Sequence, residues 1–295
     1  MGSNRILPKR IILVRHGESQ GNLDNAAYTT TADHRIPLTA AGVRQAREAG
    51  AEIRRIVAWS EEDWRVYFYV SPYARTRATL SEIGRSFSRR EIAGVREECR
   101  IREQDFGNFQ EEKKMQADKK KRQRFGRFFF RFPEGESAAD VYDRVTSFLE
   151  SLWRDIDMNR INRCGISNFN IVIVSHGVTS RVFLMKWFRW TVEQFERLHN
   201  LTNCQVRVMQ LGAGGEYSLA IHHSDEEMKG WGLSQEMITD QKMRATAKKS
   251  DWIDDCPWHL NDFFQHLRES DEADCLEEDQ QDSLNLIGDR SIDCS

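Results

Sequence analysis

The sequence predicts an α/β protein built as a three-layer sandwich, with helices flanking a mostly parallel central sheet. Three short segments, residues 11–14, 66–70 and 171–174, consist of aliphatic or aromatic side chains, as buried parallel strands do. Segments with apolar residues at helical spacing follow these strands along the chain. Alternating strands and helices are typical of a single α/β domain, and 295 residues suffice for one with a large core.

Two long helices are predicted from their capping residues. Thr39 precedes a helix that extends to residue 57, and Ser137 precedes one that ends near Met158. Between the first strand and Thr39 we expect a polar loop over residues 23–37. The other expected elements are helices over residues 73–87, 178–187 and 192–198, a short strand and turn within residues 95–110, and strands over residues 205–211 and 217–222.

The composition indicates a soluble globular protein. Hydrophobic residues make up 39% of the chain and charged residues 30%. No apolar run reaches the roughly 18 residues of a membrane span, and the first apolar segment is too short for a signal peptide. Six cysteines without C-x-x-C spacing favour reduced thiols, so we expect a cytoplasmic protein.

Charge is divided unevenly along the chain. Residues 251–295 contain fourteen Asp and Glu but two Arg, a net charge of −12, which leaves +9 on the rest. We therefore predict one domain over residues 1–245 that binds anionic ligands, and an acidic, flexible tail over residues 246–295. One hypothesis is that this tail covers the basic domain and competes with an anionic substrate.

A basic insertion over residues 111–132 interrupts the alternation of strands and helices. Its part from Lys113 to Arg131 contains nine Lys or Arg and a single Asp, and we expect it to be helical up to about Phe125. Five phenylalanines lie near its end. Two interpretations stay open: a lid whose cations attract phosphorylated substrates, or a solvated helix whose phenylalanines pack on the domain.

Polar side chains follow three of the predicted strands at the points where those strands end. Arg15 and His16 follow the first strand, Arg75 lies just beyond the second, and His176 follows residues 171–174. Each of these residues alone would most often have a structural role. Because the carboxyl ends of parallel strands meet at one crevice, their joint occurrence predicts a functional site.

These residue types suit phosphoryl transfer. Arginine binds phosphate through two parallel hydrogen bonds and stays charged, and a neutral histidine can accept the phosphoryl group covalently. Glu103, in a predicted turn, can protonate a leaving alkoxide and then deprotonate a water. No cluster with metal-ligand spacing lies near them, so we expect chemistry without a metal or other cofactor. His222 and His223 would point to opposite faces of an edge strand, which argues against a metal site there.

Four separated motifs, spread over residues 8–222, resemble the phosphoglycerate-mutase-like branch of the histidine phosphatase superfamily. They are Leu-Val-Arg-His-Gly-Glu-Ser at residues 13–19 with Asn22, Ser-Pro-Tyr-Ala-Arg-Thr-Arg at residues 71–77, Glu103 before Phe106 and Gly107, and Val-Ser-His-Gly at residues 174–177. The resemblance implies the three-layer fold predicted above. Three segments resemble a narrower group, the plant phosphoglycerate-mutase-like proteins and a fungal broad-range acid phosphatase. They are residues 101–110, 132–145 and 180–190.

The resemblance also implies a role for the residues of these motifs. His16 would be the nucleophile that becomes phosphorylated, and Glu103 would donate and accept the proton. Arg15, Arg75 and His176 would complete the catalytic set by binding the phosphoryl oxygens. The implied phosphate-binding residues are Arg15, Asn22, Arg75, His176 and Gly177.

We expect a metal-independent phosphomonoesterase of broad, acid-phosphatase type that forms a phosphohistidine and acts on small phosphorylated metabolites. Residues 25–37 and 108–110 lack the patterns of cofactor-dependent mutases, which weakens the alternative of a phosphoglycerate mutase that uses 2,3-bisphosphoglycerate. The alternative from another class is a catalytically weak protein that binds phosphorylated ligands. No base-stacking module such as RNP1 is present, so no nucleic-acid partner is expected, and the oligomeric state is left open.

Overall fold

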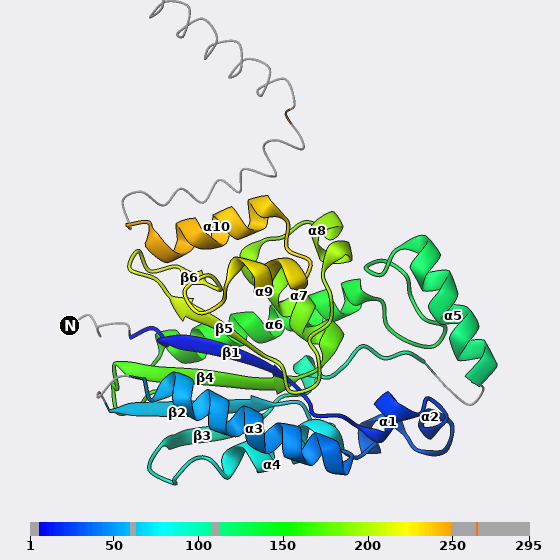
Figure 1. Cartoon of the computed structure of the whole chain (residues 1–295), viewed down its shortest axis with the longest axis horizontal. Helices are drawn as coiled ribbons and strands as arrows, with labels where there is room; N and C mark the ends of the chain where they lie inside the picture. The colour runs from blue at the N-terminus through cyan, green and yellow to red at the C-terminus, as the bar shows by residue number, and fades with distance from the viewer. Residues whose placement is uncertain (1–5, 60–62, 108–111, 249–263, 265–295) are drawn as a thin grey trace, which may run out of the picture. The chain divides into compact units, whose positions relative to one another are not determined.

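The computed structural model in Figure 1 describes residues 6–59, 63–107 and 112–248, together with Phe264. Its contacts divide the chain into two units, Met1–Trp252 and Ile253–Ser295. All the helices and strands described belong to the first unit. The predicted acidic tail, and with it the hypothesis of a tail that competes with substrate, lies almost wholly outside the described residues.

A six-stranded sheet forms the centre of the first unit, as far as its residues are described. Its strands are β1 (Arg10–Arg15), β2 (Trp64–Val70), β3 (Ile92–Glu97), β4 (Asn168–Ser175), β5 (Val206–Leu211) and β6 (Tyr217–Ser218). They lie in the order β3-β2-β4-β1-β5-β6; the first four are parallel, and β5 and β6 are antiparallel to their neighbours. Every residue of β4 is buried, as its continuous apolar segment predicts.

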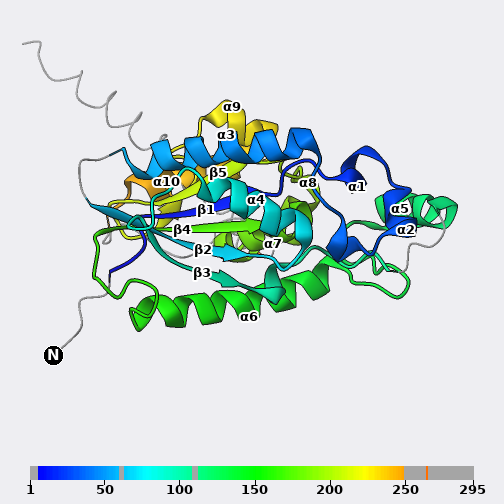
Figure 2. The same ribbon diagram turned by 90° about the horizontal axis from the view of Figure 1, so that it is seen from below.

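Helices cover both faces of this sheet. They are α1 (Gln20–Leu23), α2 (Ala27–Thr30), α3 (Ala40–Val57), α4 (Ala74–Gly84), α5 (Glu112–Phe125), α6 (Ala138–Asp157), α7 (Gly177–Phe188), α8 (Val192–Arg197), α9 (Asp225–Gly230) and α10 (Gln235–Thr246), with the 3-10 turns η1 (Asp33–Arg35) and η2 (Cys99–Ile101). Figure 2 shows α3 and α6 on opposite sides of the sheet. The predicted three-layer sandwich with a mostly parallel sheet is therefore confirmed.

The two faces of β2 contribute to two apolar cores. Ile53 of α3 and Ile83 of α4 are buried in one cluster with Phe68 of β2. The next strand residue, Tyr69, points to the other face, where its ring centroid lies 5.3 Å from that of Phe148 in α6. The sheet is thus fixed between α3 and α4 on one side and the α6–α7 pair on the other.

Both predicted capping residues start their helices. The Thr39 hydroxyl accepts a hydrogen bond from the Gly42 amide at the start of α3. Ser137 forms a reciprocal capping box with Asp140 at the start of α6. These two helices also end close to the predicted positions, α3 at Val57 and α6 at Asp157.

Several predicted elements differ from the structure. The strand expected within residues 95–110 begins earlier, at Ile92, and the helix expected over residues 73–87 ends at Gly84. Residues 23–37, expected as a loop, contain α2 and η1 and the last residue of α1. Helical segments of three or four residues are too short to show a period. The strand expected over residues 217–222 ends at Ser218, so His222 and His223 lie in a turn and not on an edge strand.

Helices α9 and α10 have no counterpart in the prediction. Gln241 of α10 explains the early end of β6: its main-chain oxygen accepts from the Ser218 hydroxyl at 2.5 Å, and its side-chain oxygen accepts from the Leu219 amide at 2.8 Å. The Leu219 amide therefore donates to α10 and not to a neighbouring strand. The helix continues to Thr246, one residue beyond the domain limit predicted at residue 245.

The carboxyl ends of β1, β2 and β4 meet at one edge of the sheet. The register pairs Arg15 with Ser175 and Val70 with Val174. The residues that follow these three strands therefore lie side by side, as the site prediction requires. In the part of the chain that the structure describes, no helix combines the length and the hydropathy needed to cross a membrane.

Candidate active site

His16 follows β1 and is held with one ring nitrogen bonded to the protein. Its amide donates to the Ser175 carbonyl at 3.0 Å, which fixes the turn against β4. Its ring Nδ1 lies 2.7 Å from the Gly17 carbonyl oxygen. Because a carbonyl oxygen only accepts, Nδ1 carries the proton, and Nε2 keeps the lone pair that a nucleophile needs.

Gly17 allows α3 and α4 to approach the turn that carries His16. A Cβ at Gly17 would lie 2.5 Å from the Gly42 carbonyl oxygen at the start of α3. The Gly17 amide donates to the Thr79 hydroxyl of α4 at 3.0 Å, and that hydroxyl donates to the Arg75 carbonyl at 2.7 Å. These contacts fix the turn after β1 against the helix that carries Arg75.

His176 follows β4 and is completely buried. Its Nε2 lies 2.8 Å from the Ser71 hydroxyl at the end of β2. Its ring centroid lies 5.3 Å from that of His16 and 5.0 Å from that of Tyr73. In the described chain its Nδ1 has no hydrogen-bond partner. A buried polar atom without a partner is costly, so this nitrogen marks a place where a ligand atom can be accommodated.

Arg75 and Arg15 bring positive charge to the two histidines. Nη1 of Arg75 donates to the main-chain oxygen of Asp33 at 2.7 Å and to its carboxylate at 2.8 Å. Nη1 of Arg15 donates to the Leu201 carbonyl at 2.7 Å, while Arg15 Nε is buried without a partner among the described residues. Each arginine is thus anchored through Nη1, which leaves the rest of its planar fork for a ligand.

Burial and charge keep both histidines neutral. Burial lowers the pKa of His16 well below its usual value, and the positive charges of Arg75 and Arg15 lower it further. Burial likewise lowers the pKa of His176, with Arg75 and His16 acting in the same direction. His16 is therefore unprotonated near neutral pH, as its predicted role as nucleophile requires.

Glu103 is held at the N-terminus of α7 by hydrogen bonds from residues at the start of that helix. Its carboxylate accepts hydrogen bonds from the Gly177 amide at 3.1 Å and from the amide and the hydroxyl of Thr179, each at 3.4 Å. The Gln104 amide donates to it at 3.1 Å. The carboxylate thus lies beside the turn of His176. The Gly177 amide, predicted to bind phosphate, donates to this carboxylate in the structure.

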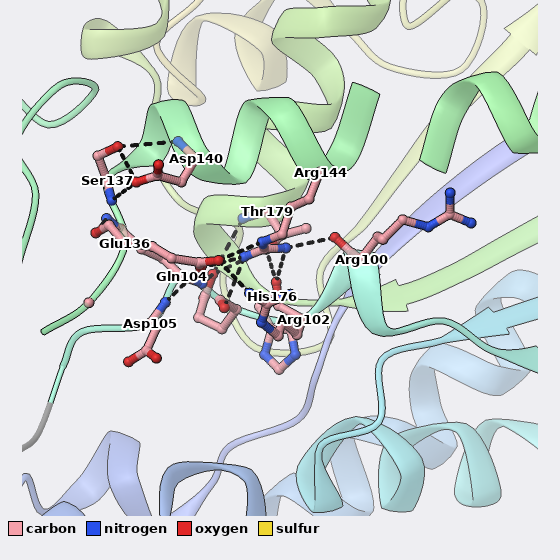
Figure 3. A network of polar contacts seen from close by, with 12 residues as sticks. Arg100, Arg102, Gln104, Asp105, Glu136, Ser137, Asp140, Arg144, His176 and Thr179 are labelled. Atoms are coloured by element: carbon pink, nitrogen blue, oxygen red, sulfur yellow. Dashed lines mark hydrogen bonds and ion pairs between the residues drawn. The ribbon is translucent and has the colours of Figure 1, made fainter. Parts of the chain in front are cut away.

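Arg144 of α6 holds the turn that carries Glu103 (Figure 3). Its guanidinium donates to the main-chain oxygens of Arg100 at 2.6 Å, Arg102 at 2.9 Å and Glu103 at 3.0 Å. The same group forms an ion pair with Glu136 at 3.0 Å. Main-chain oxygens in an irregular turn need such partners, because no ladder or helix satisfies them. Arg144 is therefore a positioning residue for Glu103.

Asn22 and Asn203 link α1 to the turn of His16. The Asn22 side-chain oxygen accepts from the Ser19 amide and from the Asn203 side chain, each at 3.1 Å. The same Asn203 nitrogen donates to the His16 main-chain oxygen at 3.1 Å. Asn22 is thus joined to the site through one intermediate residue, and its binding of phosphate stays a prediction.

The basic insertion reaches the site through α5, which lies at the same end of the molecule as α1 and α2 in Figures 1 and 2. Lys119 Nζ lies 3.3 Å from the Asn25 side-chain oxygen, between α1 and α2. Arg122 lies over the rings of Phe106 and Phe132, at 5.9 and 5.3 Å, and its Nε is buried without a partner in the described chain. Two cations of the insertion therefore turn inward, and Phe132 is fully buried beneath them.

Sequence reasoning missed several residues of this site. Ser71 and Tyr73 lie in the motif that carries Arg75, so a signal for them existed. Asp33 and Asn203 come from segments without a motif. Among the described residues, no group of three or more His, Cys, Asp or Glu side chains is arranged to hold a metal ion. Metal independence stays a prediction.

Comparison with known proteins gives this arrangement a family. The model of the histidine phosphatase superfamily (branch 1) matches residues 11–223. The chain belongs to the histidine phosphatase superfamily. The matched range contains every predicted site residue of this member, from Arg15 to Gly177, and the predicted resemblance to the superfamily is confirmed.

Two relatives and one solved structure extend this result. The chain is 66% identical to Phosphoglycerate mutase-like protein AT74 of Arabidopsis thaliana, over 95% of this chain and 89% of the relative. It is 35% identical to Broad-range acid phosphatase DET1 of Saccharomyces cerevisiae, over 69% of this chain and 86% of the relative. The structure of YhfR from Bacillus stearothermophilus has the same fold, with a TM-score of 0.52 and 20% identity over 72% of this chain and 95% of that one. The narrower resemblance to plant and fungal members is therefore confirmed.

Proposed function

We propose that this member of the histidine phosphatase superfamily is a metal-independent phosphomonoesterase that acts through a phosphohistidine at His16. The observation that carries the proposal is the 2.7 Å hydrogen bond between His16 Nδ1 and the Gly17 carbonyl oxygen. It leaves Nε2 unprotonated beside Arg15 and Arg75, where an anionic phosphate is attracted. The 35% identity to a broad-range acid phosphatase supports a phosphatase that accepts many small phosphorylated metabolites.

In the first step, His16 Nε2 attacks phosphorus, so that a P–N bond forms and the ester P–O bond breaks. Glu103 gives a proton to the leaving oxygen. Arg15 and Arg75 offset the charge on the equatorial phosphoryl oxygens, which is where phosphoryl transfer needs it. His176 donates to one of these oxygens from Nδ1, while the Ser71 hydroxyl donates to its Nε2.

In the second step, a water attacks the phosphohistidine. Glu103, now a carboxylate, takes a proton from the water, the P–N bond breaks, and inorganic phosphate leaves neutral His16 behind. The two arginines supply fixed positive charge in the place that a metal would otherwise occupy. One carboxylate therefore serves as acid and then as base.

The basic insertion favours small anionic substrates in this proposal. The positive charge of Arg122 interacts with the negative charge of the Glu103 carboxylate. Lys119 contacts Asn25, and its charge interacts with that of Arg122. These side chains add positive charge near the carboxylate, so they attract substrates whose remainder is also anionic.

Trapping the phosphoenzyme tests the proposal. The full chain is mixed with a radiolabelled phosphate monoester, quenched, and examined for label that is stable in alkali and lost in acid, as phosphohistidine is. We expect label on the wild type and on His222→Ala, a matched control at an exposed histidine, and none on His16→Ala. Turnover of p-nitrophenyl phosphate should be unchanged by EDTA. Persistent label in His16→Ala would contradict the proposal.

Adding 2,3-bisphosphoglycerate separates the alternatives. We expect inorganic phosphate to be released from a panel of sugar phosphates, nucleotides and phosphoglycerates without that cofactor. Interconversion of the phosphoglycerates faster than their hydrolysis would favour the mutase. Tight binding of phosphate esters with neither label nor release would favour the phospho-ligand-binding protein.

A further inference from the structure

A cavity lined by arginines lies over strands β2 and β3, and its lining contains no residue of the candidate active site. Its volume is about 400 Å³, and it is formed by the first half of β2, by β3 from Ile92 to Arg96, and by the turn that precedes β4. No Asp or Glu lines it. Its lining includes five arginines, Arg65, Arg89, Arg96, Arg160 and Arg163.

Neighbouring carboxylates neutralise little of this charge. Asp155 forms ion pairs with Arg96 at 2.7 Å and with Arg160 at 3.3 Å, so one carboxylate serves two arginines. Asp155 is itself buried behind them and does not line the cavity. The arginines that pair with no carboxylate of the described chain are Arg65, Arg89 and Arg163.

The turn that carries two of these arginines has a fixed shape. The Asn162 side chain is only 6% exposed; it donates to the Ile166 main-chain oxygen at 2.9 Å and accepts from the Ile166 amide at 3.0 Å. The Arg160 amide donates to the Asp155 main-chain oxygen at 2.9 Å. Arg160 and Arg163 therefore extend from a backbone that needs no further ordering when a ligand binds.

This cavity is separate from the active site. Strand β2 runs from Arg65 at the cavity to Val70, next to Ser71 at the active site. At about 3.3 Å per residue, Arg65 lies roughly 20 Å from Ser71. Arg96, which pairs with Tyr69, is the lining residue of β3 nearest the active site. Neither His16 nor His176 lines the cavity, so a small ligand held there contacts neither histidine.

We propose that this cavity binds a ligand that carries several phosphate groups. A volume of about 400 Å³ suits a small molecule. Arginine forks bind phosphate oxygens in pairs, and several clustered phosphates engage several forks at once. A ligand with one phosphate would leave most of the arginines unpaired. Two sources offer this chemistry, a free polyphosphate and the headgroup of a multiply phosphorylated inositol lipid.

Calorimetric titration with inorganic tripolyphosphate tests this proposal. The parent is the full chain with His16→Ala, so that the proposed hydrolysis cannot consume the probe. Arg65→Gln with Arg163→Gln removes two unpaired arginines from the cavity, and we expect affinity to fall at least about tenfold. The matched control, Arg44→Gln with Arg47→Gln, removes two charges from α3 and should change affinity by less than about twofold. Thermal unfolding of each variant checks that it is folded.

Other variants decide between sites. Adding Arg75→Ala weakens any binding at the active site and should leave the cavity site intact. Equal affinity in the parent and the Arg65→Gln/Arg163→Gln variant would overturn the proposal. Loss of binding when Arg75→Ala is added to the parent, with all five arginines of the cavity intact, would also overturn the proposal, because the probe would then bind at the active site. The proposed phosphatase activity is measured separately in a His16-containing chain, so the two proposals can fail independently.

Vesicles and RNA complete the test. If the ligand is a lipid headgroup, the parent should bind phosphatidylcholine vesicles that contain a phosphatidylinositol bisphosphate. Tripolyphosphate should then displace the parent from these vesicles. Binding of tripolyphosphate without vesicle binding supports a free polyphosphate. A single-stranded RNA that binds more tightly than tripolyphosphate, and that loses binding in the cavity variant, would overturn the assignment to a small ligand.

Discussion

The turns after β1 and β4 have the same His-Gly sequence, on neighbouring parallel strands, yet they expose opposite nitrogens of the imidazole. At His16, Nδ1 is bonded to the Gly17 carbonyl, and no hydrogen bond of the described chain uses Nε2. At His176, Nε2 is bonded to the Ser71 hydroxyl, and Nδ1 has no partner in the described chain. Both rings are buried, and burial lowers the pKa of each.

The origin of each partner explains the difference. The Gly17 carbonyl belongs to the turn of His16 itself and can only accept, so that turn fixes the ring by local geometry. Ser71 reaches His176 from β2, and its hydroxyl can donate or accept. A His-Gly sequence therefore places an imidazole at a strand end, while the partner decides whether it can act as a nucleophile or as a donor to phosphate.

The largest loss of activity should come from replacing either histidine, one at a time, by alanine. For His16→Ala we expect kcat with p-nitrophenyl phosphate to fall at least about 10⁴-fold, because the covalent route is lost. For His176→Ala we expect a loss of about 10²–10³-fold, since one donor to phosphate is removed and the nucleophile stays. Steady-state kinetics measure both. Equal losses, or a His176→Ala enzyme that forms no phosphoenzyme, would show that the roles are assigned wrongly.

Glu103→Gln should separate nucleophilic attack from proton transfer. Glutamine keeps the size of the side chain but can neither donate nor accept the proton, so we expect turnover of an alkyl phosphate to fall about 10²–10⁴-fold. The loss in kcat/KM should be smaller with p-nitrophenyl phosphate, because kcat/KM covers only the steps up to release of the alcohol and p-nitrophenolate leaves without a proton. Steady-state kinetics compare the two substrates. As a control, labelling of the phosphoenzyme shows that His16 of the variant still attacks phosphorus. Identical losses in kcat/KM for the two substrates would contradict the role of Glu103 as proton donor.

The two glycines that follow the histidines should differ in their tolerance of alanine. A Cβ at Gly17 would meet the Gly42 main-chain oxygen at 2.5 Å, whereas a Cβ at Gly177 would meet the Asn200 side chain at 3.0 Å. A backbone atom cannot rotate away, so we expect Gly17→Ala to lower the free energy of unfolding by about 1–3 kcal/mol. Gly177→Ala, at the first position of α7, should change it by less than about 1 kcal/mol. Denaturant unfolding gives both values, and the reverse ranking would contradict this account.

Acid should destabilise the protein through both buried histidines. Their pKa values lie below that of an unfolded histidine. Below about pH 6.5 the unfolded chain therefore binds protons that the folded chain does not. As the pH decreases further, the free energy of unfolding falls by about 1.4 kcal/mol per pH unit for each histidine. Unfolding is measured between neutral pH and the acid limit of folding. His176→Asn should reduce the slope, the exposed His34→Asn should not, and equal slopes in all three chains would contradict the mechanism.

The strand ends could be predicted because their signal is local. Aliphatic segments before Arg15 and His176 fix where each strand stops, and parallel pairing then brings the two ends together. The same logic placed Arg75 and its helix beside them. Fold class and the main site residues therefore follow from patterns that span only a few residues.

The partners of these residues could not be predicted, because each comes from a distant segment. Asp33 pairs with Arg75 from a segment expected to be a loop, and Arg144 reaches the turn of Glu103 from a helix whose pattern shows only its apolar face. The helix α9 did have a signal, since Ser224 and Glu227 form a capping box. A hydrogen-bond partner from a distant segment depends on the packed fold, and no local spacing of residues predicts it.

The contact between Gly17 and Gly42 has a consequence for how this protein can change. A Cβ at Gly42 would lie 2.1 Å from the Glu18 main-chain oxygen, so each glycine is constrained by backbone on the other side. Neither clash can be relieved by a second substitution, because no side chain takes part in it. Libraries that seek new substrates should therefore keep this pair constant and randomise inward-facing positions of α5, such as Lys119 and Arg122.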